Sequence, residues 1–170
     1  MNQQYLSAIP QNLHPASKVW VYQSSRLFSM NEVFELETLL TAFVNEWESH
    51  GAPVKGFANL FFGRFIVFIA DDTDSKICGR AIDGVARFVK EIETKFQLHL
   101  LDRLALAFYI KEKVEILPLS HLNYAIENGF VTKETLYFNN LVQTKQEFET
   151  RWIIPAGQSW LATKFSLEKA

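Results

Sequence analysis

The most suggestive polar segment of the sequence covers residues 71–83, between an apolar stretch and an expected helix. Ligand sites in proteins that mix strands and helices often lie where a strand ends and a helix begins. Gly79 and Gly84 have the spacing of the two glycines in a phosphate-binding loop. Val85 and Ala86 follow, where that loop needs lysine and then serine or threonine. Because no lysine is present to bind the β- and γ-phosphates, the sequence excludes a P-loop nucleotide hydrolase.

The same segment begins with three aspartates, Asp71, Asp72 and Asp74, whose oxygens are of the kind that hard cations prefer. The regular ligand series and the distant glutamate of a calcium loop are missing, so we expect these carboxylates to turn the chain. They also face the positive end of the next helix, where a negative charge is stabilising. Asp83 lies in the first turn of that helix and has the same structural explanation, with a role in a site left open. No metal and no cofactor is predicted.

Cys78 and the four histidines are the remaining residues with reactive side chains. A position near a helix N-terminus lowers the pKa of a thiol, but Cys78 has no CxxC partner and no histidine nearby in the sequence. We therefore expect Cys78 to be a small, buried and unreactive side chain. No two histidines have the spacing of a metal pair. Only His50, at the expected end of a helix, is retained as a candidate site residue.

The elements that must position these residues follow from hydrophobic periodicity. Apolar residues at helical spacing predict one helix from Val33 to Trp47, ended by Gly51, and a second helix from Ile82 to Phe96. Between them, Gly63-Arg64 predicts a two-residue type II′ turn with a positive φ at the glycine. Apolar runs predict strands over residues 18–22, 57–62, 65–70, 104–110 and 114–117.

These elements occur in the order βαββαβ, which is the ferredoxin-like split motif. Residues 119–170 are expected to add a short helix closed by Gly129, a strand near 135–138 and a helix from a capping box at 144–147. We therefore predict an α+β fold with a ferredoxin-like core over residues 18–118 and a mainly helical, packed C-terminal extension over 119–170. The whole of 1–170 is predicted to be a single domain, with residues 1–17 as an arm laid over it.

Composition restricts the function further. The net charge is −2 and lysine and arginine are dispersed, so a nucleic-acid-binding surface is not expected. No apolar run is long enough for a membrane helix, and the start of the chain does not resemble a signal peptide. A single cysteine among 170 residues suits a reducing compartment. We therefore expect a cytoplasmic protein that binds neither nucleic acid nor membrane.

Several segments resemble an uncharacterised family of short bacterial proteins, some of which carry the label "ABC transporter ATPase". The resemblance spans residues 19–160. Its segments are FVNEWESHGAPVKG (43–56), FIVFIADD (65–72), AIDGVARFVKEIE (81–93), LDRLALAF (101–108), Phe138-Asn139-Asn140 and Ser159-Trp160. The family pattern reads Ser-Gly-Cys-Ser-Ile-Asp where this chain has Cys78-Gly79-Arg80-Ala81-Ile82-Asp83, so Arg80 replaces the family's cysteine. The resemblance supplies positions but no chemistry, and the missing P-loop lysine argues against the ATPase label.

Two functions remain open: a non-catalytic binding or interaction domain, with self-association as a homodimer as one option, and a small enzyme. For either, the candidate pocket consists of the residues that fit the family pattern, namely Trp47, His50, Asp72, Asp83 and Arg103. Arg103 is expected to pair with Asp72 or Asp83 in a partly buried, mainly structural ion pair. The small-molecule ligand is not specified by the sequence.

Overall fold

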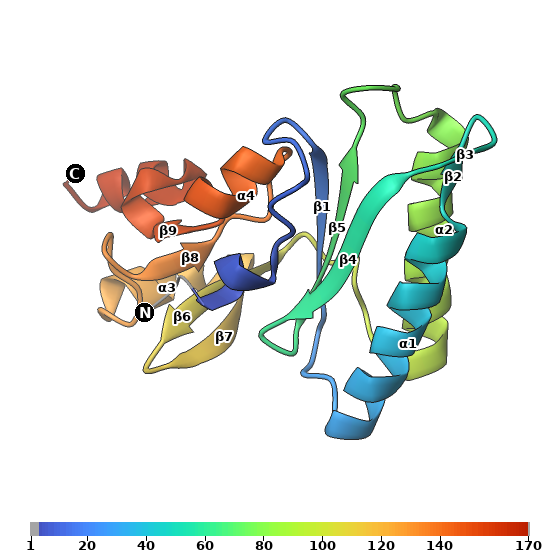
Figure 1. The fold of residues 1–170 in the computed structure, drawn as a ribbon. Helices are drawn as coiled ribbons and strands as arrows, with labels where there is room; N and C mark the ends of the chain where they lie inside the picture. Colours follow the sequence, from blue (N-terminus) through green and yellow to red (C-terminus); the bar gives the residue numbers. More distant parts are fainter. Residues whose placement is uncertain (1–3, 170) are drawn as a thin grey trace. The chain divides into compact units, whose positions relative to one another are not determined.

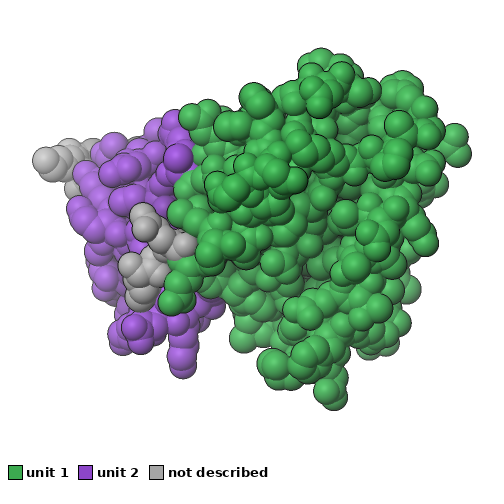
Figure 2. Space-filling view, viewed as in Figure 1, with its two compact units in different colours: residues 1–101, 142–149 green, residues 102–141, 150–170 purple. Residues whose placement is uncertain are grey.

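The computed structural model describes residues 4–169, with side chains through residue 166, and divides the chain into two units, coloured separately in Figure 2. Unit 1 contains residues 1–101 and 142–149, and unit 2 contains residues 102–141 and 150–170. The division falls near residue 101, whereas the sequence suggested a change of structure at residue 118. That residues 1–170 form a single domain stays a prediction.

Unit 1 consists of an antiparallel sheet with two long helices on one face (Figure 1). Its elements are η1 (Gln4–Ala8), β1 (Lys18–Gln23), α1 (Met30–Glu46), β2 (Glu48–Ser49), β3 (Ala52–Pro53), β4 (Lys55–Phe61), β5 (Phe65–Asp71) and α2 (Gly79–Phe96). The main sheet has the strand order β1-β5-β4, and β2 and β3 form a separate hairpin.

Strand β5 is central because its side chains are apolar on both faces. Residues 65–70 are completely buried. Ile66, Phe68 and Ala70 belong to the core beneath α1 and α2. In the N-terminal arm, the ring of Tyr5 contacts that of Phe61 edge-on, with 6.2 Å between the centroids, and its hydroxyl donates a hydrogen bond to the Phe148 carbonyl. The described residues of the N-terminal arm are therefore tied to the rest of unit 1.

Unit 2 contains the elements that follow. They are β6 (Ala105–Ile110), β7 (Lys113–Pro118), η2 (Leu119–His121), α3 (Leu122–Glu127), β8 (Leu136–Phe138), β9 (Ile153–Pro155), η3 (Ala156–Gln158) and η4 (Trp160–Lys169). Its strands form one antiparallel sheet in the order β7-β6-β8-β9. Helix α4 (Lys145–Arg151) begins in residues assigned to unit 1 and ends in residues assigned to unit 2.

Two finer expectations about the fold are not confirmed by this topology. Strand β6 pairs with β7 and β8, so the sheet of unit 1 holds only the first three strands of the expected βαββαβ order. Beside β1, the segment before α4 forms a single bridge from Thr144 to Lys18. The C-terminal segment contains the short helices η2, α3, α4, η3 and η4, but its strands β8 and β9 also join the sheet begun by β6 and β7, so a mainly helical extension is not confirmed. The mixed α and β class itself is confirmed.

The β4–β5 hairpin is present, but its turn differs from the expected type II′. Gly63 has the expected positive φ of 60°, and Phe62 before it also has a positive φ of 53°. The Arg64 N–H closes the turn on the Phe61 carbonyl at 3.0 Å. Two consecutive positive φ values define a type I′ turn, which matches the twist of the flanking strands. A phenylalanine in this conformation was not signalled by the sequence.

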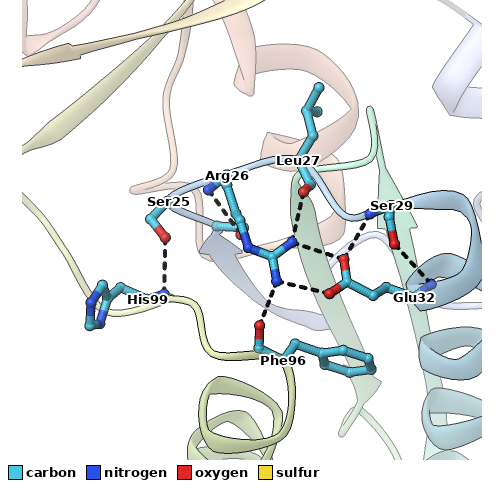
Figure 3. A network of polar contacts seen from close by, with 8 residues as sticks. Ser25, Arg26, Leu27, Ser29, Glu32, Phe96 and His99 are labelled. Atoms are coloured by element: carbon cyan, nitrogen blue, oxygen red, sulfur yellow. Dashed lines mark hydrogen bonds and ion pairs between the residues drawn. The ribbon is translucent and has the colours of Figure 1, made fainter.

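Helices α1 and α2 are fastened together at one end by a polar network (Figure 3). Arg26 donates two hydrogen bonds to Glu32, each of 2.8 Å, and another to the Phe96 carbonyl at the end of α2. Glu32 also accepts the Ser29 N–H and completes the capping box that starts α1. Glu32 thus takes part in the cap at the start of α1, and its partner Arg26 binds the carbonyl at the end of α2.

We predict that Glu32→Gln lowers the stability of the protein at neutral pH. Hydrogen bonds from Arg26 and Ser29 outweigh burial and lower the pKa of Glu32 to about 2. A depressed carboxylate pKa stabilises the fold fully above the unfolded pKa, and this contribution is lost as the pH falls toward the folded pKa. The difference in unfolding free energy between wild type and variant is therefore expected to shrink between about pH 5 and about pH 2.

Urea titrations across that pH range measure the difference. Glu37→Gln, which removes an exposed carboxylate from the same helix, is the matched control. If the difference in unfolding free energy between the wild type and Glu32→Gln is the same at pH 7 and at pH 3, the role assigned to the network is contradicted.

Candidate functional site

A groove with a volume of about 990 Å³ lies at the other end of the helix pair, between the last turns of α1, the first turns of α2 and the β2–β3 hairpin. Its apolar lining comes from both helices and the residue after α1: Leu39, Phe43, Trp47, Ala81 and Phe88. Helix α1 begins and α2 ends at the fastened end, so the groove lies where α1 ends and α2 begins (Figure 1). All of these residues belong to unit 1.

Trp47 is the central residue of the groove lining. Its side chain is buried, and its indole N–H donates a hydrogen bond of 3.0 Å to the Ala81 carbonyl in α2. Gly56 of β4 leaves room for the ring, because a Cβ at that position would lie 2.7 Å from the ring atom Cε3 of Trp47. The ring is therefore held between a strand of the sheet and the first turn of α2.

Two further aromatic rings extend this surface along the helices. Phe43 of α1 lies 5.3 Å from Trp47 and stacks on Phe88 of α2, with 4.6 Å between the ring centroids. Aromatic pairs in these geometries add stabilisation beyond the area that they bury. Phe43 and Phe88 are partly buried and present a partly exposed aromatic surface to the groove, whose lining also includes the buried Trp47.

The rim of the groove carries charges of both signs. Arg80 and Arg87 come from α2, and Glu46, Glu48 and Glu91 come from the end of α1, the hairpin and α2. All five residues are exposed. The groove therefore combines an aromatic lining with a rim of mixed charge.

The β2–β3 hairpin closes the groove where α2 begins. His50 and Gly51 form its turn, and both have positive φ values, of 53° and 77°. This conformation costs a residue with a Cβ about 1–2 kcal/mol. The sequence predicted Gly51 as the end of the first helix, but α1 ends at Glu46 and Trp47 is its C-cap. Strands of two residues are too short to give a periodic signal, so the hairpin was missed.

Cys78 is the residue whose role the sequence most underestimated. It is the N-cap of α2, lines the groove and is only partly buried, so it is less buried than expected. A hydrogen bond from the Ser49 hydroxyl, together with the N–H groups of Ala81, His50 and Arg80, lowers the pKa of its thiol to about 7. The signal available in the sequence was its position directly before an amphipathic helix.

The predicted site residues are partly brought together. Trp47 and His50 both line the groove. Asp72 is buried and pairs with Lys18, with 3.2 Å between its Oδ2 and the lysine Nζ. Asp83 is exposed on α2, and Arg103 is exposed in the turn before β6 in unit 2. The expected partial burial of Asp83 and Arg103 is therefore wrong, and the pairing of Arg103 stays a prediction.

Asp71, considered above as a cation ligand, has the structural role expected of it. Its oxygens accept hydrogen bonds from the His14 N–H, the Lys55 ammonium and both the N–H and the hydroxyl of Thr73. Burial favours the protonated form, but these hydrogen bonds outweigh it and hold the pKa of Asp71 well below its usual range. Within residues 4–169, the structure shows no group of three or more His, Cys, Asp or Glu side chains suited to a metal ion.

Comparison of the chain with protein-family models, with curated proteins and with solved structures gives no significant match. The resemblance to a family of short bacterial proteins therefore stays a prediction. In the described part of the chain, no helix has the length and apolar character needed to cross a membrane.

We predict that Cys78 reacts with iodoacetamide at near-neutral pH, with a rate that follows a titration midpoint near pH 7. The thiolate is the reactive form, so a lowered pKa moves the rise in rate to lower pH than the value of about 8.5 for a free cysteine. Mass spectrometry of the intact protein measures the rate at each pH. The sequence-based expectation of an unreactive thiol predicts no modification of the native protein, and that outcome would contradict the site geometry.

Proposed function

We propose that unit 1 is a non-catalytic binding domain, and that its groove binds an organic anion with a flat apolar body. The observation that carries this proposal is the aromatic lining of Phe43, Trp47 and Phe88 beside the start of α2. The proposal narrows the binding function expected from the sequence to one groove and one class of ligand.

The aromatic lining supports an apolar, planar part of the ligand. Partly exposed rings at the surface of a groove gain free energy when a ligand removes them from water, at roughly 25 cal/mol per Å². The groove volume of about 990 Å³ is at the upper end of the range for small-molecule sites. A ligand of two fused or linked rings fits within that volume.

The first turn of α2 supports the anionic part. The side chain of the N-cap residue Cys78 makes no capping hydrogen bond to this 18-residue helix, in contrast to the capping box of α1. The positive end of a helix favours negative charge. Arg80 on the rim adds a formal positive charge in the same turn. The carboxylates Glu46 and Glu48 on the rim would disfavour a ligand carrying several negative charges.

A second candidate function is a thiol-dependent reaction in the same groove. The lowered pKa of Cys78 favours it, because about half of the thiol is ionised near pH 7. In that case Cys78 is the nucleophile, and the N–H groups that favour its thiolate belong to Ala81, His50 and Arg80. This candidate replaces the Asp72, Asp83 and Arg103 group as the basis for an enzyme.

The finer expectations from the sequence are carried here as proposals. Unit 1 is proposed to be a ferredoxin-like motif whose fourth strand is replaced, beside β1, by the bridge from Thr144 to Lys18. A cytoplasmic bacterial protein, a homodimer and the absence of nucleic-acid and membrane partners also remain proposals. Light scattering tests for the homodimer, and direct binding measurements test for nucleic-acid and membrane partners.

We predict that the fluorescent anion 1-anilinonaphthalene-8-sulfonate binds unit 1 in the intact protein at one saturable site. N-phenyl-1-naphthylamine, which has the same rings without the sulfonate, is expected to bind more weakly. Arg80→Ala is expected to weaken binding of the sulfonate dye by up to about fivefold, the range for an exposed charge pair, and to leave the neutral dye unchanged. Lys90→Ala, an exposed cation of the same helix outside the groove lining, is the matched control.

The sulfonate dye is also expected to bind more weakly as the pH rises through about 7, because ionisation of Cys78 places a second negative charge beside it. Cys78→Ser should remove this pH dependence. Equal binding of the two dyes would contradict the anionic part of the proposal. If neither dye binds, the groove is not a site for this class of ligand.

A further inference from the structure

We propose that the β2–β3 hairpin, residues 48–53, is a movable lid over the groove, and that Ser49 is the latch that holds it against α2. The inference rests on the proposed function, since a lid matters only if the groove is occupied. It concerns a different property, however, namely how the groove opens.

The first argument is that the hairpin forms part of the groove wall. Glu48, His50 and Gly51 line the groove together with the two helices. Figure 1 shows the hairpin at the end of the helix pair where α1 ends and α2 begins, whereas the Arg26–Glu32 network lies at the start of α1. Movement of these residues therefore changes the access to the groove without disturbing the end where the helices are fastened.

The second argument is that the hairpin has little to hold it closed. Each strand has two residues, and five of its six residues are exposed. His50 also has an unfavourable positive φ of 53°. Segments with few buried apolar contacts open at a much lower free energy than the core.

The third argument is that both ends of the hairpin are fixed. Trp47 is buried before it, and the Val54 N–H donates a hydrogen bond of 2.8 Å to the Trp47 carbonyl at its base. The base therefore stays in place while residues 48–53 move. This is the arrangement expected for a hinge at the ends of a rigid element.

The latch is Ser49, the one residue of the hairpin that is partly buried. Its Oγ accepts a hydrogen bond of 2.9 Å from the Cys78 N–H, and the Ser49 hydroxyl is the main cause of the lowered pKa of the Cys78 thiol. This hydrogen bond is lost if the hairpin moves away from α2. Opening then increases the access to the thiol and to the first turn of α2.

The test uses Cys78 as a reporter and needs no ligand. The rate of iodoacetamide modification is measured across pH for the wild type, Ser49→Ala and Ser49→Thr. The midpoint reports the pKa of the thiol, and the plateau at high pH reports access to the thiolate. For Ser49→Ala we expect a higher midpoint, because a hydrogen bond to the thiolate is lost, and a plateau about fivefold higher, the shift in an opening equilibrium caused by loss of one hydrogen bond. Ser49→Thr keeps the hydroxyl and should restore both values.

An unchanged plateau with a raised midpoint would overturn the lid, since Ser49 would then act on the thiol alone. If Ser49→Ala does not fold, hydrogen exchange of the wild type decides instead. The Cys78 amide is expected to exchange by local opening, far faster than the Val54 amide at the base of the hairpin. Equal protection of the two amides would overturn the proposal. If Ser49→Ala raises the plateau rate of modification but the protein binds neither dye, the lid is supported and only the proposed class of ligand is refuted.

Discussion

The position of Trp47 is the constraint on which the rest of unit 1 depends. Its ring fits between the sheet and α2 only because Gly56 has no side chain, and its indole N–H satisfies the Ala81 carbonyl in the first turn of α2. This contact fixes where α2 begins relative to the sheet. It also fixes where α1 ends, because Trp47 is the C-cap of that helix and its carbonyl closes the base of the hairpin. The groove, the hairpin and the position of Cys78 all follow from one buried ring.

The two ends of the helix pair have different physical properties. At one end Arg26, Glu32 and the Phe96 carbonyl form a charged network, and Lys95 pairs with Glu35 at 2.6 Å. At the other end the contacts are aromatic and leave space, so the helices are linked there through Trp47 rather than through ion pairs. A fastened end and an open end together create a groove whose width is set at one side by the hairpin.

The sequence predicted the local elements well, because most of them carry strong periodic or capping signals. The capping box at 144–147 is an example: Thr144 accepts the Glu147 N–H, although Glu147 reaches back to the N–H of Gln143 rather than to that of Thr144. Prediction from the sequence failed where the pairing of strands distant in the sequence decides the fold. Nothing in residues 105–110 tells whether that strand pairs with β1 or with β8, and the two-residue strands around His50 have no period at all.

The candidate site was half predicted for the same reason. Trp47 and His50 lie in one local segment, whereas Asp72, Asp83 and Arg103 depended on a sheet that is not formed as expected.

The central claim is that the groove beside Trp47 binds an organic anion, and the indole N–H resonances of the four tryptophans test it most directly. Trp47 lies in the groove lining, whereas Trp152 and Trp160 belong to unit 2. Titration of the ¹⁵N-labelled protein with 1-anilinonaphthalene-8-sulfonate is predicted to shift the Trp47 resonance saturably and to leave those of Trp152 and Trp160 in place. A Trp47 resonance that stays fixed while the dye binds elsewhere would contradict the account.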